Sequence, residues 1–277
     1  MKYSINYYKG CRYLNKTDEI MIDYSEKDTA LLKFVKKYDA PRIVVNCTQI
    51  SEEDLLGSID LFKVASKMKA FAVLLRFEQK KYLPDLAENN IKYFFTEHVN
   101  TIDKLNSLIQ LGVSDVYITD ELGFCLKDVG IICHENKVNV RVYPNIAQST
   151  GKVDGDTFKY FYIRPEDVSI YEPYVDYFEF FGKLDRQAVL YKIYKEGQWL
   201  GSLNELIGGL KDEIPNVCIV PYFGTARVGC GKRCSYNKSC EVCSNIKNLA
   251  KVLESKDFGI TTERKKIDEG MKIKYDK

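Results

Sequence analysis

The sequence predicts an α/β protein built as a TIM-type (β/α)8 barrel, partly degenerate in its later units, with a cysteine-rich C-terminal extension. Over the first 200 residues, short runs rich in β-branched and aromatic residues alternate with longer amphipathic runs. This alternation recurs about every 22–25 residues, which is the pattern of parallel strands joined by helices. A count of eight such strands favours a closed barrel, and an open doubly wound sheet is the alternative.

The predicted strands are near-continuous apolar segments, as expected for a parallel sheet covered by helices. Amphipathic stretches at residues 28–38, 51–69 and 101–111 supply the early helices. Ser51 precedes two glutamates and Asp54, which is typical of an N-cap followed by an acidic first turn. In chain order, the eight predicted strands are residues 19–24, 42–48, 70–76, 91–97, 115–119, 138–143, 159–164 and 175–181.

The repeat weakens late in the chain. Residues 144–158 contain two glycines and little helical pattern, and residues 165–171 leave room for only a short helix. A closing helix is predicted at residues 183–196. We therefore expect a barrel at residues 1–200 and an extension at residues 201–277.

The composition is that of an ordinary folded protein. Of the 277 residues, 45% are hydrophobic and 29% are charged, and 41 basic against 39 acidic side chains give a net charge of +2. The longest apolar run, residues 70–75, is far shorter than a bilayer span, and the first residues lack the apolar segment of a secretory leader. We expect a cytoplasmic protein with no membrane partner. The last 50 residues carry a net charge of +5, which mildly indicates an anionic partner such as nucleic acid.

Four of the nine cysteines lie within fourteen residues, and this cluster is the strongest signal in the chain. Cys230, Cys234, Cys240 and Cys243 form the pattern C-x3-C-x5-C-x2-C. Thiolates at this spacing can converge on one centre, and four of them satisfy either zinc or a 4Fe-4S iron–sulfur cluster. We expect a metal centre here. The spacing leaves the choice between the two open, and Cys218 is able to replace one of the four ligands.

Polar side chains at the carboxyl ends of the barrel strands are expected to meet at one mouth, where function is sought. Arg164 is expected to pair there with Asp120, Glu97 or Glu179, or to hold an anionic group of a ligand. His98 directly follows a predicted strand and is a candidate acid or base. No G-x-S-x-G, H-E-x-x-H or phosphate-loop motif occurs, so the usual signatures of hydrolases, zinc proteases and nucleotide hydrolases are absent.

Two segments resemble the collagenase-like peptidases, peptidase family U-32. Residues 108–149 contain a helix and the sequence LGVSD, followed by a strand that ends in an Asp, a second helix and a strand with a polar end. Residues 160–198 are similar to the family's Arg-Glu strand end and to its acidic last strand. The resemblance covers residues 40–200. It implies a (β/α)8 barrel with a cysteine-bound iron–sulfur cluster that modifies RNA bases or quinones, with hydroxylation as one such reaction.

By this similarity, Asp120, Arg164, Glu166 and Glu179 are the predicted catalytic residues. Asp120 takes the place of the family's strand-end Asp, Arg164 and Glu166 that of its Arg-Glu pair, and Glu179 that of the Glu in its last strand. Where the family has a His-Gly-Ala-x-Cys segment, this chain has FFGK after Glu179. The cluster cysteines would therefore come from the C-terminal extension.

These observations lead to three hypotheses of function. The first is an iron–sulfur protein that modifies RNA or a small molecule. The second is a zinc-stabilised, non-catalytic module that binds nucleic acid or protein, as the basic C-terminal segment indicates. Peptide hydrolysis ranks third, because no nucleophile and base stand at a diagnostic spacing.

Overall fold

The computed structural model describes residues 1–7, 14, 16–24, 28–146, 160–210, 214–216, 219, 223–228, 245, 248–249 and 251. The chain divides into two compact units, each described by itself. The sheet unit comprises Met1–Ile118, Gly130–Val142 and Val175–Ala188. The second unit comprises Thr119–Val129, Tyr143–Tyr174 and Val189–Lys277.

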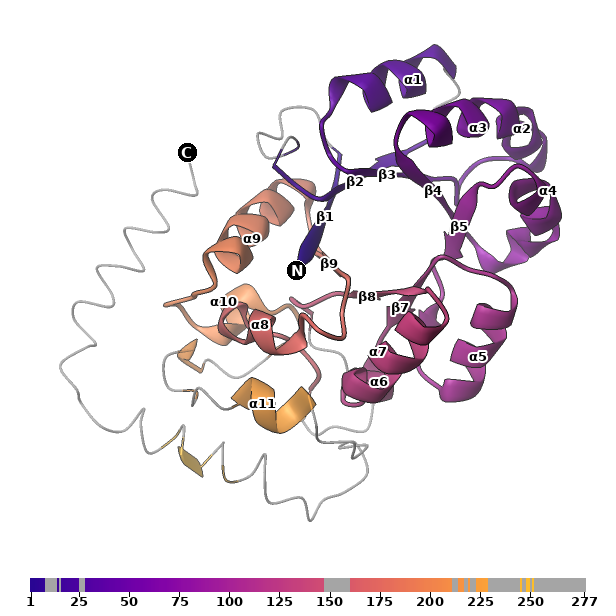
Figure 1. Ribbon diagram of the computed structural model, residues 1–277. Coiled ribbons are helices and arrows are strands. Elements are labelled where there is room, and N and C mark those ends of the chain that lie inside the picture. The colour runs from indigo at the N-terminus through magenta and orange to yellow at the C-terminus, as the bar shows by residue number, and fades with distance from the viewer. Residues whose placement is uncertain are drawn as a thin grey trace. The chain divides into compact units, whose positions relative to one another are not determined.

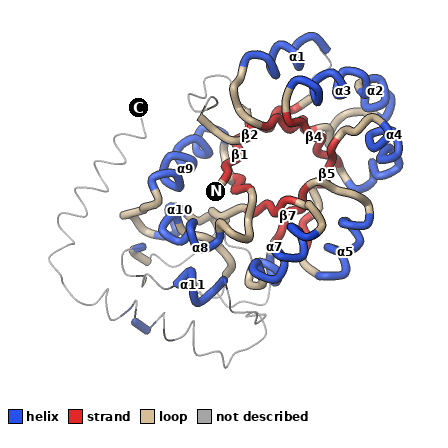
Figure 2. The backbone as a smooth tube through the Cα atoms, in the orientation of Figure 1, coloured by secondary structure: helices blue, strands red, loops and turns tan. Residues whose placement is uncertain are grey.

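The sheet unit contains a strongly curled sheet in which all pairings between the described strands are parallel. The order across its nine described strands is β5-β4-β3-β2-β1-β9-β8-β7-β6. Figure 2 shows the strands bent around a common axis. Their bounds are β1 (Lys2–Asn6), β2 (Glu19–Asp23), β3 (Arg42–Asn46), β4 (Ala70–Leu75), β5 (Lys92–Phe95), β6 (His98–Val99), β7 (Asp115–Ile118), β8 (Asn139–Val142) and β9 (Tyr177–Glu179).

The sheet is TIM-like but open, with β5 and β6 at its two edges. These edge strands are neighbours in the chain and are separated only by Thr96 and Glu97. The amide of Ser114, just before β7, donates a 2.8 Å hydrogen bond to the Tyr93 carbonyl in β5. The two edges are therefore linked by chain continuity and by this one backbone bond.

Helices lie on the outside of the curl in the sheet unit (Figure 1). Ser51 caps α2 as predicted, because its Oγ accepts a hydrogen bond from the Asp54 amide. Thr101 does the same at the amide of Lys104. These elements are α1 (Asp28–Lys37), α2 (Glu52–Gly57), α3 (Ile59–Met68), the 3-10 helix η1 (Phe77–Tyr82), α4 (Leu83–Glu88) and α5 (Ile102–Gln110).

Two helices are shared between the units, namely α7 (Leu126–Glu135) and α9 (Leu184–Glu196). The second unit consists of short elements joined by irregular chain. They are α6 (Asp120–Gly123), η3 (Pro165–Asp167), α8 (Val168–Tyr171), α10 (Leu203–Leu206) and α11 (Phe223–Val228). Among the described residues, no helix has the length and apolar character that a bilayer crossing requires.

The parallel β/α class is confirmed, and the closing helix at 183–196 corresponds to α9. One of the eight strand predictions is wrong, and one strand was not predicted. The aromatic run at 159–164 is not a strand of the sheet: its described residues belong to the second unit, where Phe161, Tyr162 and Ile163 are buried. The N-terminal segment KYSIN, which was not predicted, forms β1 between β2 and β9. Burial of aromatic side chains, which the sequence shows, does not by itself specify pairing in a sheet.

Candidate functional site

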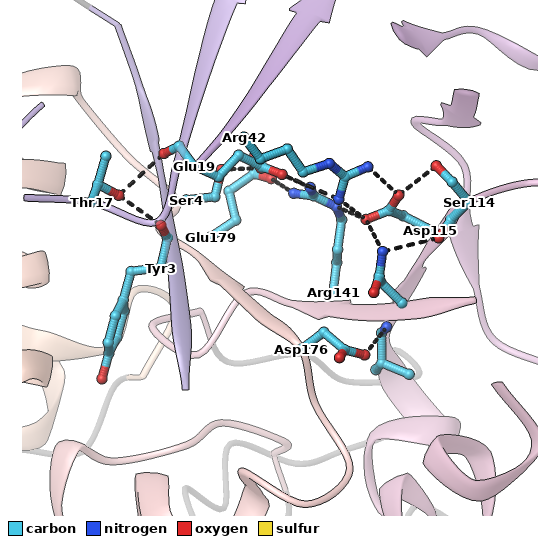
Figure 3. A network of polar contacts seen from close by, with 12 residues as sticks. Tyr3, Ser4, Thr17, Glu19, Arg42, Ser114, Asp115, Arg141, Asp176 and Glu179 are labelled. Carbon is cyan, nitrogen blue, oxygen red and sulfur yellow. Dashed lines mark hydrogen bonds and ion pairs between the residues drawn. The ribbon is translucent and has the colours of Figure 1, made fainter. Parts of the chain in front are cut away.

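Five charged side chains meet inside the curled sheet, and all five are buried. Alternate residues of a strand face the same side of a sheet, and the register places Ser4 opposite both Glu19 and Glu179. Glu19 in turn stands opposite Arg42 in the neighbouring strand. This ionic core, drawn in Figure 3, consists of Glu19, Arg42, Asp115, Arg141 and Glu179.

Two arginines join the three carboxylates of the ionic core. Arg42 binds Asp115 through both terminal nitrogens, at 2.7 and 2.6 Å. Arg141 reaches Asp115 through Nε at 3.0 Å, and its terminal nitrogens contact Glu19 and Glu179. Bidentate contacts of this kind are among the strongest polar interactions in proteins. They connect β2, β3, β7, β8 and β9, which are distant in sequence.

Burial and charge act in opposite directions on the ionic core. Burial alone would raise the pKa of the Asp115 carboxyl, but the nearby guanidinium groups of Arg42 and Arg141 hold it well below its ordinary range. Burial alone would lower the pKa of Arg141, but Glu19 and Asp115 keep it well above its ordinary value. Asp115 is therefore ionised at neutral pH, and so are Arg42 and Arg141.

The carboxylates outnumber the arginines, and hydroxyl groups supply the missing hydrogen bonds. Ser4 Oγ donates to Glu19 at 2.7 Å, and the Tyr117 hydroxyl donates to Glu179 at 2.7 Å. Glu179 is only 4% exposed. Its carboxylate is thus held by Tyr117 and Arg141 within the ionic core, an arrangement that fixes the sheet register rather than presenting an acid to solvent.

A second, smaller group of hydrogen-bonded polar side chains lies at the carboxyl ends of β2 and β3 in the sheet unit. Asn46 Nδ2 donates to Asp23 at 2.9 Å, and Thr48 Oγ1 donates to Asn46 at 2.7 Å. An apolar cavity of about 230 Å3, lined in part by Phe34 and Leu31, borders the exposed carboxylate of Asp23. This end of the sheet could hold a small ligand with an apolar body and one polar group.

In the second unit, Arg164 and Glu166 lie in one buried polar cluster. Arg164 makes a bidentate pair with Asp167, at 2.7 and 2.9 Å. Glu166 Oε1 accepts hydrogen bonds of 2.7 Å from the Trp199 amide and from Asn216 Nδ2. Glu166 Oε2 is buried and has no hydrogen-bond partner within the described part of the chain. Arg164 thus pairs with Asp167, three residues away on the same turn, a partner that was not among those expected from the sequence.

Among the described residues of the second unit, Arg227 is a second buried cation. It is 2% exposed, and its guanidinium lies 4.6 to 5.1 Å from the ring centres of Phe223, Tyr162 and Phe124. One terminal nitrogen donates to the Tyr160 carbonyl. Among the described residues, Nε and Nη1 of Arg227 have no hydrogen-bond partner. A buried guanidinium whose charge is not balanced and whose hydrogen-bond donors are not all used favours an anion beside it.

The four predicted catalytic residues fall in different places. Glu179 belongs to the sheet unit, and Arg164 and Glu166 belong to the second unit. Asp120 is the first residue of α6, and the structure does not describe its side chain. These roles stay predictions. The sequence reasoning missed Glu19, Arg42, Asp115 and Arg141, although a charged residue inside an apolar strand such as NVRV is a signal for them.

The four cysteines of the predicted metal centre, Cys230, Cys234, Cys240 and Cys243, lie outside the described residues. Within the described ranges, no group of three or more His, Cys, Asp or Glu side chains is placed to hold a metal ion. Comparison with models of known protein families finds no match, and comparison with curated proteins finds none either.

Proposed function

We propose that this protein is an iron–sulfur barrel protein that modifies RNA or a small molecule, similar in plan to the collagenase-like peptidases. The observation that carries the proposal is the quartet Cys230, Cys234, Cys240 and Cys243 in a chain that also forms a curled parallel β/α sheet. Four thiolates in fourteen residues suit a 4Fe-4S cluster, which supplies single-electron transfer when it is bound.

The proposal includes a closed (β/α)8 barrel. Counting β5 and β6 as two parts of one interrupted strand gives eight strand positions around the curl. Two facts support this count: only Thr96 and Glu97 separate the two strands, and Ser114 donates to Tyr93 across the gap. Barrels of this kind place their functional groups at the carboxyl ends of the strands.

Arg227 supports an anionic centre in the second unit. It precedes Cys230 by three residues, and its buried guanidinium has two nitrogens without a partner in the described part of the chain. A cation there would offset the negative charge of metal-bound thiolates. Arg164, by contrast, is neutralised by Asp167 and would act by positioning Glu166.

The experiment is metal analysis after purification without oxygen. The full chain should contain about four iron and four sulfide per protein molecule, and a visible absorption band that bleaches with dithionite. Cys240→Ser should lose most of the iron. Cys125→Ser, at a half-buried cysteine far from the quartet in sequence, should keep it. Iron-free wild-type protein, or equal iron in both variants, would overturn the proposal.

A zinc-stabilised binding module is the second candidate, because the last 50 residues have a net charge of +5. In that case one zinc per chain replaces the iron, and RNA binding should weaken steeply as salt is added. A flat salt response would contradict phosphate contacts.

A further inference from the structure

An open cavity of about 570 Å3 lies at the amino ends of the strands in the sheet unit. Arg42 and Lys92 open β3 and β5, and both line the cavity. Lys63 and Lys67 lie one turn apart on α3, the helix that leads into β4, and line it too. The cavity thus stands at the strand ends opposite those where a β/α barrel carries its reaction site.

The lining of this cavity is strongly one-sided in charge. Four of its residues are cationic and none is acidic. Arg42 is already paired with Asp115, so its charge is balanced inside the sheet. Lys63, Lys67 and Lys92 are exposed, and within the described residues none of them forms an ion pair. Three ammonium groups around one cavity repel each other, and an anion bound between them removes that repulsion.

The rest of the lining is suited to a compact polar ligand rather than to a bare ion. Asn90 adds a side-chain amide to the lining. Ser66, Asn89 and Asn139 also line the cavity, with their side chains hydrogen-bonded within the protein. Asn90 has a left-handed backbone with φ of 56°, which turns the chain at the entry to β5. The ring of Tyr177 also lines the cavity, and the guanidinium of Arg42 lies 5.3 Å from its centre. A volume of this size is within the range of small-molecule sites.

We propose that this cavity binds a phosphorylated small molecule of nucleotide size, with its phosphate held by Lys63, Lys67 and Lys92. The side-chain amide of Asn90 would contact a remaining polar group of the ligand. This site is separate from the proposed metal centre in its residues, and its test does not need the metal.

The test is calorimetric titration of the full chain with ADP, with adenosine as the phosphate-free probe. ADP should bind and adenosine should not. Lys63→Glu with Lys67→Glu should weaken ADP binding by about tenfold or more, because it places two carboxylates where the phosphate is held. The matched control, Lys33→Glu with Lys36→Glu on the exposed face of α1, makes the same charge change and should alter binding less than about twofold.

Lys92→Gln provides a milder variant and should weaken ADP binding in the same direction. The same titration in Cys240→Ser should match the wild type. Absence of ADP binding, equal loss in both double variants, or equal binding of adenosine would each overturn the proposal. So would tighter binding of a single-stranded RNA than of ADP through the same lysines, since that result assigns the cavity to a polymer.

Discussion

Replacement of Arg141 by methionine is the most severe test of the ionic core. Arg141 is completely buried, and its guanidinium contacts Glu19, Asp115 and Glu179. Methionine fills part of the space but removes a guanidinium contact from each of the three carboxylates, while Arg42 still contacts Glu19 and Asp115. Removal of one partner from a buried ion pair costs about 3–5 kcal/mol. Because three carboxylates lose a contact here, we expect Arg141→Met to lower the free energy of unfolding by at least about 3 kcal/mol.

The assay is urea unfolding at neutral pH, followed by far-ultraviolet circular dichroism. Lys192→Met is the control, because it breaks the exposed pair between Lys192 and Glu196 and should cost less than about 0.5 kcal/mol. A loss below about 1 kcal/mol for Arg141→Met would refute the ionic core as a main stabilising feature.

Three further outcomes follow from particular side chains. Asp115→Asn should destabilise the protein at neutral pH. Burial would raise the pKa of this carboxyl, but two buried arginines hold it below its ordinary value of 3.8. The contribution of the carboxylate to the free energy of unfolding is therefore complete above about pH 4 and is lost as the pH falls further. Urea unfolding across this range should show the two proteins converging only in acid. Gly224→Ala should lower the melting temperature, because a Cβ there would lie 2.8 Å from Asp167 Oδ1. Gly57→Ala is the control: its Cβ would meet nothing within 4 Å, so the melting temperature should rise slightly. Burial raises the pKa of Cys133 to about 12, so mass spectrometry should find this thiol unmodified after brief alkylation of the native protein at mildly alkaline pH.

The sequence predicts most strands of the sheet for a simple physical reason. β2, β3, β4 and β7 are apolar runs buried on both faces, and such runs are visible without a structure. β1 was missed because KYSIN alternates polar and apolar residues over only five positions. Its place in the middle of the sheet depends on pairing with β2 and β9, which no local pattern reveals.

The ionic core illustrates why the site is harder to predict than the fold. Glu19, Arg42 and Asp115 each open a strand, so in the sequence they resemble charged flanks that face solvent. Only the curl of the sheet and its register bring these side chains inside and opposite each other. Arg141 differs, since it stands within the apolar run NVRV, where a charge requires a buried partner.

For Arg164, the sequence analysis expected a distant partner where the structure has a local one. A charged residue after an aromatic run was expected to reach across a barrel mouth, but a carboxylate at i+3 lies within its reach on η3. Local partners cost less chain ordering than distant ones and therefore take precedence when the geometry allows them. The partners of Arg227 were not anticipated from the sequence, because the three rings around it come from separate segments.

X-ray absorption at the iron and zinc edges of the full chain, purified without oxygen, tests the proposed centre most directly. The proposal predicts iron with only sulfur in its first coordination shell and further iron atoms nearby, as in a cluster. Zinc surrounded by four sulfur atoms would remove the electron-transfer role and favour the binding module. Metal with oxygen or nitrogen ligands, or no bound metal and four freely reactive thiols, would contradict the centre altogether.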